Sequence, residues 1–300
     1  MISEIVRDYP ILSTFTRYSI GAARVVSMDL MDVTARGSGA SAKKQTSIMY
    51  MLARQVMTRD FFIDAEEIES MVQRGSIPPM YEEYHVKKAT QTKNMPKILC
   101  MDEYHRCGSI EAVNDQLLQD AREGRKFNVD IRVASQLIED FPKPIIEVST
   151  ALIVCNAGSE NSITYLDEMF RLTENEKGIL RHNLNGPSSR GAPLWTMFKT
   201  KAHGQVRQEL LLTLGPAELW AFSTTADDVA LRSELYKQIG PTATRKVLAT
   251  RYPGGSAKSD IETRMARLEE LGSRGAGSGR GNVLGDLVRE LKEQSFIMNQ

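Results

Sequence analysis

The stretch Lys97-Ile98-Leu99-Cys100-Met101-Asp102-Glu103 decides the fold of this 300-residue chain. A short continuous apolar run such as residues 98–101 is typical of a strand buried in a parallel sheet. The two acids that follow would then lie at the carboxyl end of the strand, where open α/β sheets bind their ligands. We therefore predict a buried parallel strand over 97–101, with Asp102 and Glu103 as candidate site residues.

The acid pair suits the chemistry of nucleotide hydrolysis. In P-loop ATPases one carboxylate at this place holds the Mg²⁺ shell and another orients the attacking water. The alternative is a solvated strand end whose acids have no function. The loop that cradles the phosphates, G-x-x-x-x-G-K-[ST], is absent from the 300 residues. The sequence thus predicts the back half of an ATPase, with the phosphate loop encoded upstream of Met1.

One segment, residues 37–44, has the position of a phosphate loop but lacks two of its essential residues. Ala42 stands where the second glycine belongs, and Lys44 stands where the Mg²⁺-binding Ser or Thr belongs. Alanine resists the backbone conformation that glycine adopts, and an ammonium group cannot ligate Mg²⁺. We reject this segment as a working phosphate loop.

The composition is that of a globular chain. Apolar residues make up 41% and charged residues 25%, close to the globular average. Lys plus Arg and Asp plus Glu both number 38, so the net charge gives no reason to expect nucleic-acid or membrane binding. Three cysteines without paired spacing fit a reducing cytoplasm. Because neither a membrane-spanning run nor a signal-peptide pattern is found, we expect a cytoplasmic or peripheral protein.

Strand and helix patterns alternate through the first half of the chain, which predicts a parallel sheet with covering helices. The expected strands are 24–30, 97–101, 129–133 and 151–155, and the expected helices are 43–62, 108–123, 159–170 and 173–182, with further helix between 63 and 95. Asp130 and Arg132 alternate with valine and isoleucine, which indicates a strand that is buried on one side. The run 151–155 is expected to be buried.

The second half predicts a hairpin, a group of helices and a tail. Residues 193–199 and 206–214 form the expected hairpin, and helices follow from Pro216 to about Tyr252. The Gly- and Ser-rich run 272–281 has the composition of a flexible linker. The last helix carries an apolar stripe of Val283, Leu284, Leu287, Val288 and Leu291. This stripe either docks a partner or packs on its own domain.

Two further features lie where nucleotide hydrolysis needs them. Gln136 follows the strand 129–133 and should emerge at the same sheet edge as the acid pair. A neutral amide there can contact a γ-phosphate or hold water without competing for Mg²⁺. The helix after the acid pair ends in Arg122, Arg125 and Lys126. An Arg can neutralise charge during phosphoryl transfer, often from a neighbouring subunit; the alternative is a basic helix terminus favoured by the macrodipole.

Other chemistry-bearing residues are interpreted as structural. Cys100, His105 and Cys107 lack a C-x₂-C pair and a nearby fourth ligand, so we interpret Cys100 as a small core residue. Trp195 and Trp220 are interpreted as packing residues, because no basic stripe for nucleic acid accompanies them.

Several motifs occur together in a characteristic order: 26–30, Cys100-Met101-Asp102-Glu103, Arg122-Glu123-Gly124-Arg125-Lys126, Ala134-Ser135-Gln136, 172–176 and 218–225. This order resembles the carboxyl-terminal motor domain of type IV secretion and conjugation ATPases of the TraC-like class, relatives of the HerA/FtsK-like motors. Within this class the likeness is greatest to the IcmB (DotO) ATPases of Dot/Icm-type systems. It covers about residues 20–240.

The resemblance implies a RecA-like P-loop ATPase core, three-layered with a mostly parallel sheet, incomplete at its amino terminus and followed by carboxyl-terminal helices. It implies ATP and Mg²⁺ as cofactors, with Asp102 on Mg²⁺ through water and Glu103 as the catalytic carboxylate. Gln136 would lie near the γ-phosphate, and Arg125 would be the arginine finger. The expected domains are the core at 1–240, a helical extension at 241–271, and the linker with the terminal helix at 272–300.

The resemblance also implies a homo-oligomer, a hexamer, at the cytoplasmic face of the bacterial inner membrane. Its expected partners are secretion-channel components and other secretion ATPases, and its substrate is a secreted protein or nucleoprotein. Two other classes stay open: a non-catalytic assembly module with a vestigial acid pair, and a DNA-translocating motor of the same superfamily. The even charge balance weighs against the DNA motor, which needs clustered Lys and Arg.

Overall fold

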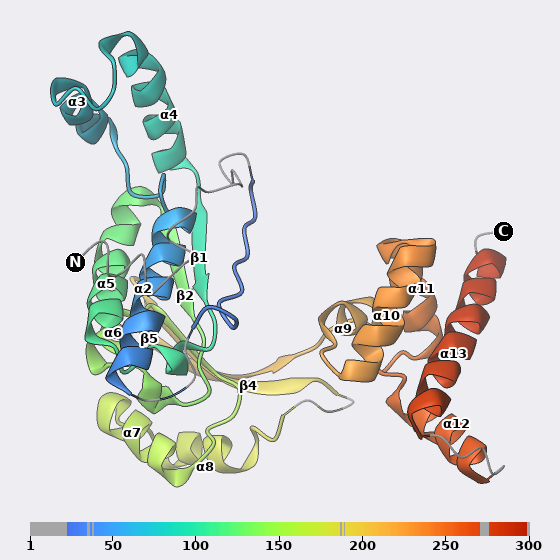
Figure 1. The fold of residues 1–300 in the computed structure, drawn as a ribbon. Helices are drawn as coiled ribbons and strands as arrows, with labels where there is room; N and C mark the ends of the chain where they lie inside the picture. Colours follow the sequence, from blue (N-terminus) through green and yellow to red (C-terminus); the bar gives the residue numbers. More distant parts are fainter. Residues whose placement is uncertain are drawn as a thin grey trace. The chain divides into compact units, whose positions relative to one another are not determined.

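The computed structural model describes residues 23–34, 37, 39–186, 188, 190–270 and 276–298. The fold is α/β, about 59% helical, with small parallel and antiparallel sheets (Figure 1). The strands are β1 Lys97–Met101, β2 Val129–Val133, β3 Ala151–Val154, β4 Ala192–Thr200 and β5 Gly204–Leu212. The α/β class expected from the sequence is thus confirmed, whereas the three-layer RecA-like core remains a proposal.

Helices connect and cover these strands. The α-helices are α2 Ala40–Met57, α3 Ala65–Gln73, α4 Glu82–Asn94, α5 Glu111–Glu123, α6 Lys143–Val148, α7 Glu160–Phe170, α8 Glu174–His182, α9 Pro216–Phe222, α10 Ala226–Ile239, α11 Pro241–Arg251, α12 Lys258–Glu270 and α13 Ala276–Met298. Short 3₁₀ turns are η2 Pro79–Tyr81, η3 Tyr104–Arg106, η4 Gly124–Phe127 and η5 Ile138–Asp140. Among the described residues, none of the helices is long and apolar enough to cross a membrane.

Strands β1 and β2 form a two-stranded parallel sheet. Lys97 lies opposite Val129, and Met101 lies opposite Val133. Helix α5 connects the two strands, as a parallel pair requires. Both strands have the bounds that the sequence predicts, and the helix begins three residues later than expected.

Only one face of this sheet is buried. Leu99 and Val129 lie in a buried cluster with Phe127, against which Met57 packs. On the opposite face Ile98 is 52% exposed. Asp130 and Arg132 are exposed as well and pair with each other at 2.8 Å. The one-sided burial predicted for β2 is therefore confirmed, whereas the continuous burial predicted for residues 97–101 is wrong, since Ile98 and Cys100 are exposed.

A partly buried ion pair fastens helix α2 to helix α5. Arg54 Nε donates to Asp120 Oδ2 at 2.8 Å, and a second guanidinium nitrogen donates to Oδ1. Gln116 also donates to Oδ1, at 2.9 Å. Bidentate Arg–carboxylate pairs fix orientation as well as distance. The two helices are thereby held in one arrangement beside the sheet.

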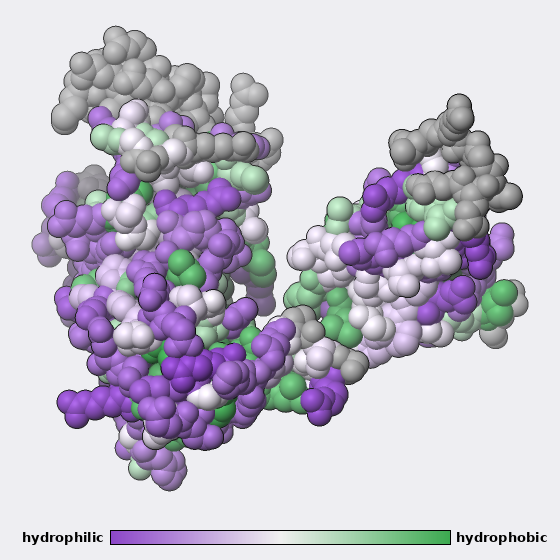
Figure 2. Space-filling model, turned by 90° about the horizontal axis from the view of Figure 1, so that it is seen from below, coloured by the Kyte–Doolittle hydropathy of each residue, from purple (hydrophilic) through white to green (hydrophobic). Residues whose placement is uncertain are grey.

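Strands β3, β4 and β5 form the second sheet, in that order. The hairpin of β4 and β5 is confirmed. The chain divides into two compact units, with boundaries within each of these strands, just after β3 and within α8. Unit 1 comprises residues 1–152, 157–177 and 197–206, and unit 2 comprises 153–156, 178–196 and 207–300. On the face drawn in Figure 2, hydrophilic residues predominate and apolar ones are scattered.

The core of unit 2 is helical and surrounds Trp220. Its other buried members are Leu231, Leu235, Val247, Leu248, Ala257, Ile261, Val283, Leu287, Val288 and Leu291. The apolar stripe of the last helix is therefore buried in its own unit, which is the second of the two roles considered for it.

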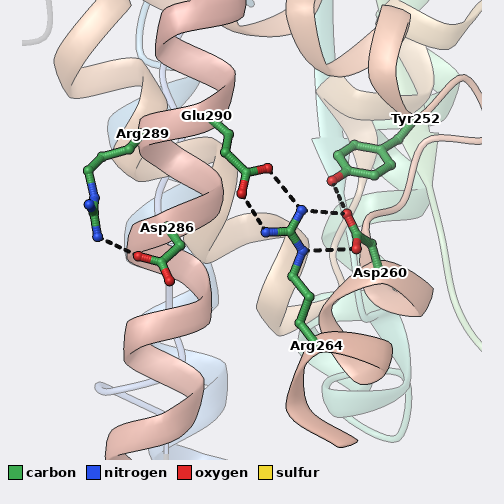
Figure 3. A network of polar contacts seen from close by, with 6 residues as sticks. All are labelled: Tyr252, Asp260, Arg264, Asp286, Arg289 and Glu290. Carbon is green, nitrogen blue, oxygen red and sulfur yellow. Dashed lines mark hydrogen bonds and ion pairs between the residues drawn. The ribbon is translucent and has the colours of Figure 1, made fainter. Parts of the chain in front are cut away.

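An ion-pair network joins α12 to α13 within unit 2 (Figure 3). Arg264 donates to the two Glu290 oxygens at 2.7 and 2.9 Å and to Asp260 Oδ1 at 3.0 Å. The Tyr252 hydroxyl donates to Asp260 Oδ2 at 2.6 Å. The hydrogen bond from Arg264 lowers the pKa of Glu290. Burial opposes the same change at Asp260, but the bonds from Tyr252 and Arg264 lower its pKa.

Three further expectations, each about a segment of the chain, are wrong. Residues 24–30, expected as a strand, have no regular secondary structure, and Val25 is 88% exposed. A strand needs a neighbour to satisfy its backbone groups, and none of the described strands lies beside this run. The run at β3 is not fully buried, since Ile153 is 56% exposed.

The third error concerns the predicted flexible linker. Residues 276–281 belong to helix α13, and residues 272–275 lie outside the described part of the chain. Tertiary packing of an apolar face stabilises most protein helices, and α13 buries such a face. Packing of the later residues therefore outweighs the weak helix propensity of the glycines.

Candidate functional site

The acid pair and Gln136 lie at the same edge of the parallel sheet. Because Met101 is opposite Val133, the residues that follow both strands emerge together at their carboxyl ends. The pairing continues beyond the strands: Ala134 N–H donates to the Met101 carbonyl at 2.9 Å, and Tyr104 N–H donates to the Ala134 carbonyl at 3.0 Å. The structure thus brings three of the four sequence-predicted site residues to one edge.

Glu103 has a left-handed backbone, with φ 54° and ψ 41°. A side chain with a Cβ pays roughly 1–2 kcal/mol for this conformation, and such residues cluster at functional sites. The Glu103 side chain is 45% exposed and lies 3.6 Å from His105 Nε2 and 4.0 Å from Arg106 Nε. Its carboxylate is therefore open to solvent and loosely paired.

Asp102 is exposed, and its Oδ1 accepts a hydrogen bond from Glu103 N–H at 2.8 Å. No Lys, Arg or His among the described residues lies within ion-pair distance of it. The described residues also contain no group of three metal-ligating side chains. Mg²⁺ is usually bound by one or two carboxylates, several waters and substrate phosphates. The residues present therefore fit a Mg²⁺ ion that is completed by a nucleotide.

Gln136 is exposed, and its side-chain amide makes no hydrogen bond with another described residue. Its neighbours in sequence are both held. Ser135 Oγ accepts from His105 N–H at 3.0 Å, and Leu137 N–H donates to Asp140 at 3.1 Å. The backbone at Gln136 is fixed while its amide is available to a ligand.

Arg125 lies at the opposite edge of the sheet. It belongs to the turn η4, which directly precedes β2, and its side chain is exposed. Each strand has five residues, so about 16 Å of strand separates the two edges at ~3.3 Å per residue. The structure therefore does not bring Arg125 to the acid pair within one chain. Arg122 is likewise exposed, in the last turn of α5.

Contacts of the neighbouring residues shape the turn that carries Arg125. Gly124 is buried, and a Cβ at this position would lie 2.8 Å from the Val129 carbonyl oxygen, so only glycine fits. Lys126 pairs with Asp64 at 3.1 Å. Burial alone would raise the pKa of Asp64, but Lys126 and the Glu67 N–H lower it. Lys126 is thus a structural residue, whereas Arg125 is exposed to solvent.

Sequence reasoning missed the residues that fix the two loops. Tyr104 is fully buried, its hydroxyl bonds Asn114 Oδ1, and its ring stacks on Phe141 with 5.4 Å between the centroids. Asp140 accepts hydrogen bonds from Ser135 and Leu137. Only the aromatic residue directly after the acid pair offered a sequence signal; Asp140 offered none.

The cysteines behave differently from one another. Cys107 is buried, and burial, opposed by its hydrogen bond with Tyr50, raises the pKa of its thiol to about 12. Cys100 is exposed, so its interpretation as a core residue is wrong: it lies on the open face of β1.

Trp195 and Trp220 are fully buried, which agrees with their interpretation as packing residues. Trp220 Nε1 donates to the Tyr252 carbonyl at 2.9 Å.

The rejected segment 37–44 precedes and begins helix α2, whose N-cap is Gly39. Lys43 and Lys44 are exposed. The segment therefore has the loop-then-helix position of a phosphate loop, but the substitutions at Ala42 and Lys44 still argue against that role.

Comparisons of the chain with protein-family models, with curated proteins and with solved structures find no match. The functional interpretation therefore rests on the residues themselves and on the geometry of this edge.

Proposed function

We propose that this chain is the carboxyl-terminal part of an ATP-hydrolysing motor of the type IV secretion and conjugation class, similar to the IcmB ATPases. The observation that supports it most is the meeting of Asp102, Glu103 and Gln136 at the carboxyl edge of a parallel sheet. In this proposal the phosphate loop lies in a segment upstream of Met1. We call the polypeptide that includes this segment the parent ATPase.

In the proposed mechanism each residue at the edge has its own role. Asp102 would hold Mg²⁺ through water, and Glu103 would orient the attacking water and accept its proton. Gln136 donates a hydrogen bond to the γ-phosphate. Bound Mg²⁺ would neutralise phosphate charge. The open carboxylate of Glu103 and the free amide of Gln136 suit these roles, because neither is committed to a strong internal bond.

Arg125 has a different place in the proposal. Because it lies at the sheet edge opposite the acid pair, it can act only on the site of another subunit. Arginine fingers supplied by a neighbour have this property. We therefore propose a ring-shaped homo-oligomer, a hexamer in the related motors, at the cytoplasmic face of the inner membrane, with secretion-channel components as partners and a protein or nucleoprotein as the substrate.

A second candidate is a non-catalytic assembly module. The lack of a phosphate loop in the 300 residues favours it, since nothing then cradles the β- and γ-phosphates. In this case the acid pair would be vestigial, and the helices would serve only to dock other proteins.

Phosphate release from ATP tests the proposal and separates the two candidates. The 300-residue chain alone should show no turnover, and the parent ATPase should hydrolyse ATP. In the parent, Asp102→Asn should weaken Mg²⁺-dependent nucleotide binding, measured by titration with and without Mg²⁺. If Asp102→Asn and Glu103→Gln both hydrolyse ATP near the parental rate, the acid pair is structural and the assembly module is favoured. Glu103-dependent turnover by the 300-residue chain would instead reopen the role of residues 37–44.

A further inference from the structure

Asp140 lies where it can hold both neighbours of Gln136. Its Oδ2 accepts a hydrogen bond from Ser135 Oγ at 2.5 Å and another from Leu137 N–H at 3.1 Å. We infer that Asp140 is a positioning residue that couples Gln136 to the acid-pair loop through Ser135. This inference rests on the proposed function, since it gives Gln136 and Glu103 a shared task.

The direction of the hydrogen bonds follows from their partners. An ionised carboxylate can only accept, so the Ser135 hydroxyl must donate its proton to Asp140. A lone pair of the same oxygen then accepts the His105 N–H at 3.0 Å. The chain of bonds runs from His105 through Ser135 to Asp140, and bonds in such chains polarise and strengthen one another.

This chain of bonds ends two residues after Glu103. His105 and Tyr104 follow Glu103 directly, and the N–H groups of both donate to the loop after β2. The left-handed backbone of Glu103 is thus held on its carboxyl side by two successive bonds. A residue in a sparsely populated conformation persists only where its surroundings over-determine it. Ser135 supplies one of these constraints, and Asp140 orients Ser135.

The residue after Asp140 makes a second connection. Phe141 stacks on Tyr104 with an interplanar angle of 10°. Gly108, four residues beyond Tyr104, packs against the Asp140 backbone: a Cβ there would lie 2.7 Å from its carbonyl oxygen. Asp140 and Phe141 therefore brace the two loops together, one by polar bonds and the other by ring stacking.

The simpler interpretation is that Asp140 only caps the short turn η5. Its bond to Leu137 N–H is such a cap, and losing a cap costs stability without a specific effect on catalysis. The bond through Ser135 to His105 separates the two interpretations, because Ser135→Ala removes it and leaves the cap intact.

Amide hydrogen exchange on the 300-residue chain tests the connection without any activity. Ser135→Ala should raise the exchange rate of the His105 amide at least about tenfold and leave that of Leu137 near its original value. Asp140→Ala should raise both rates, and Asp140→Asn, which keeps an acceptor oxygen, serves if the alanine variant fails to fold. Thr173→Ala is the matched control, since Thr173 Oγ1 caps α8 by accepting from Glu176 N–H. An unchanged His105 rate in Ser135→Ala would overturn the inference.

Steady-state kinetics of the parent ATPase test the consequence. Ser135→Ala and Asp140→Ala should lower kcat about 10- to 100-fold and leave the KM for ATP within about threefold. Ser135→Thr, which keeps the hydroxyl, should restore kcat. A purely structural cap would lower the unfolding midpoint without this division between kcat and KM. If Glu103→Gln removes hydrolysis but Ser135→Ala leaves kcat unchanged, the inference about Asp140 fails and the proposed function stands. If Glu103→Gln has no effect on hydrolysis, the proposed function fails.

Discussion

Two regions of this molecule place a glutamate beside arginine, and they do so in opposite ways. In unit 2, Glu290 accepts two bonds from Arg264 at 2.7 and 2.9 Å. At the carboxyl edge of β1, Glu103 lies 4.0 Å from Arg106 and is 45% exposed, on a left-handed backbone. Both oxygens of the Glu290 carboxylate accept from Arg264, although the Glu290 side chain is 53% exposed. The Glu103 carboxylate is positioned by its backbone, and its oxygens are available to a ligand.

The difference between the partners of these two carboxylates distinguishes structural acids from candidate catalytic ones. Stabilising carboxylates have close cationic partners and lowered pKa values, as Glu290 and Asp260 do. At the acid pair the backbone N–H groups of Glu103 and His105 donate to Asp102 Oδ1 and to Ser135 Oγ, and no cationic group of the described residues lies closer than 3.6 Å to the Glu103 carboxylate. A site that is ordered through its main chain can keep its side chains available for a ligand.

The largest expected effect in the parent ATPase is that of Arg125→Ala. An arginine finger contributes about 10³- to 10⁵-fold in rate, so hydrolysis should nearly disappear while stability is unchanged, because Arg125 is exposed. Arg264→Ala is the matched control and should keep hydrolysis. When Arg125→Ala and Glu103→Gln subunits are mixed, activity should partly return, because some interfaces again pair an intact Glu103 with an intact Arg125. Mixed oligomers confirmed by mass that show no recovery would place Arg125 outside the site.

The next largest effect is expected from replacing glutamate by glutamine, which we compare at Glu103 and at Glu290. In the parent ATPase, Glu103→Gln should lower hydrolysis about 10²- to 10⁴-fold and leave Mg·ATP binding intact, because the amide keeps the shape but cannot act as a base. Glu290→Gln should leave hydrolysis within about twofold and lower the unfolding free energy by about 0.5–1 kcal/mol. Phosphate release and urea unfolding measure the two. Equal effects of both variants on hydrolysis would contradict the distinction between the two regions.

Arg264→Ala should destabilise unit 2 in a pH-dependent manner, by about 1–2 kcal/mol at pH 7. The folded pKa values of Asp260 and Glu290 are lowered, so the network stabilises the fold above the ordinary carboxyl range and ceases to do so as the pH falls through the folded values. The difference between the original chain and Arg264→Ala should therefore shrink below about pH 4. Fluorescence can follow the unfolding, because both tryptophans, Trp195 and Trp220, belong to unit 2. A difference that does not change with pH would exclude the network as its source.

The smallest expected effect is a gain in stability. Glu103→Gly should raise the unfolding free energy of unit 1 by about 1 kcal/mol relative to Glu103→Ala, because glycine adopts the left-handed conformation without a Cβ penalty. Urea unfolding followed by the far-ultraviolet signal measures it. The matched comparison is Glu290→Gly against Glu290→Ala, where glycine in a helix interior should instead lower stability by about 1 kcal/mol. Two changes of the same sign would show that the backbone at Glu103 is unstrained.

The sequence predicts most of the parallel pair and less of its surroundings. The apolar run before Asp102 and the alternation around Ile131 place β1 and β2 correctly. Of the two patterns, only the alternation also predicts the burial correctly, because Ile98 and Cys100 in the apolar run are exposed. The position of Gln136 beside the acid pair follows from the parallel register. The run 24–30 is also rich in apolar residues but pairs with none of the described strands, and only tertiary structure decides that.

Other features depend on contacts that no local pattern encodes. Cys100 resembles a core residue by its neighbours in sequence, yet it lies on the face of β1 that is exposed. The glycines at the start of α13 suggest a linker, but burial of Leu287 and Leu291 extends the helix through them. Asp140 acts through Ser135 on a loop some thirty residues away in sequence, and such a link is visible only once the chain is folded.

The bond between Arg54 and Asp120 is part of a connection between helix α2 and the acid pair. Helix α2 begins at Ala40 and is bonded through Arg54 to α5, which the hydrogen bond between Tyr104 and Asn114 joins to the acid-pair loop. Two helices and two polar contacts therefore connect the start of α2 to Tyr104, the residue beside Glu103. Helix α2 and the acid pair are thus linked by side-chain contacts within one compact unit.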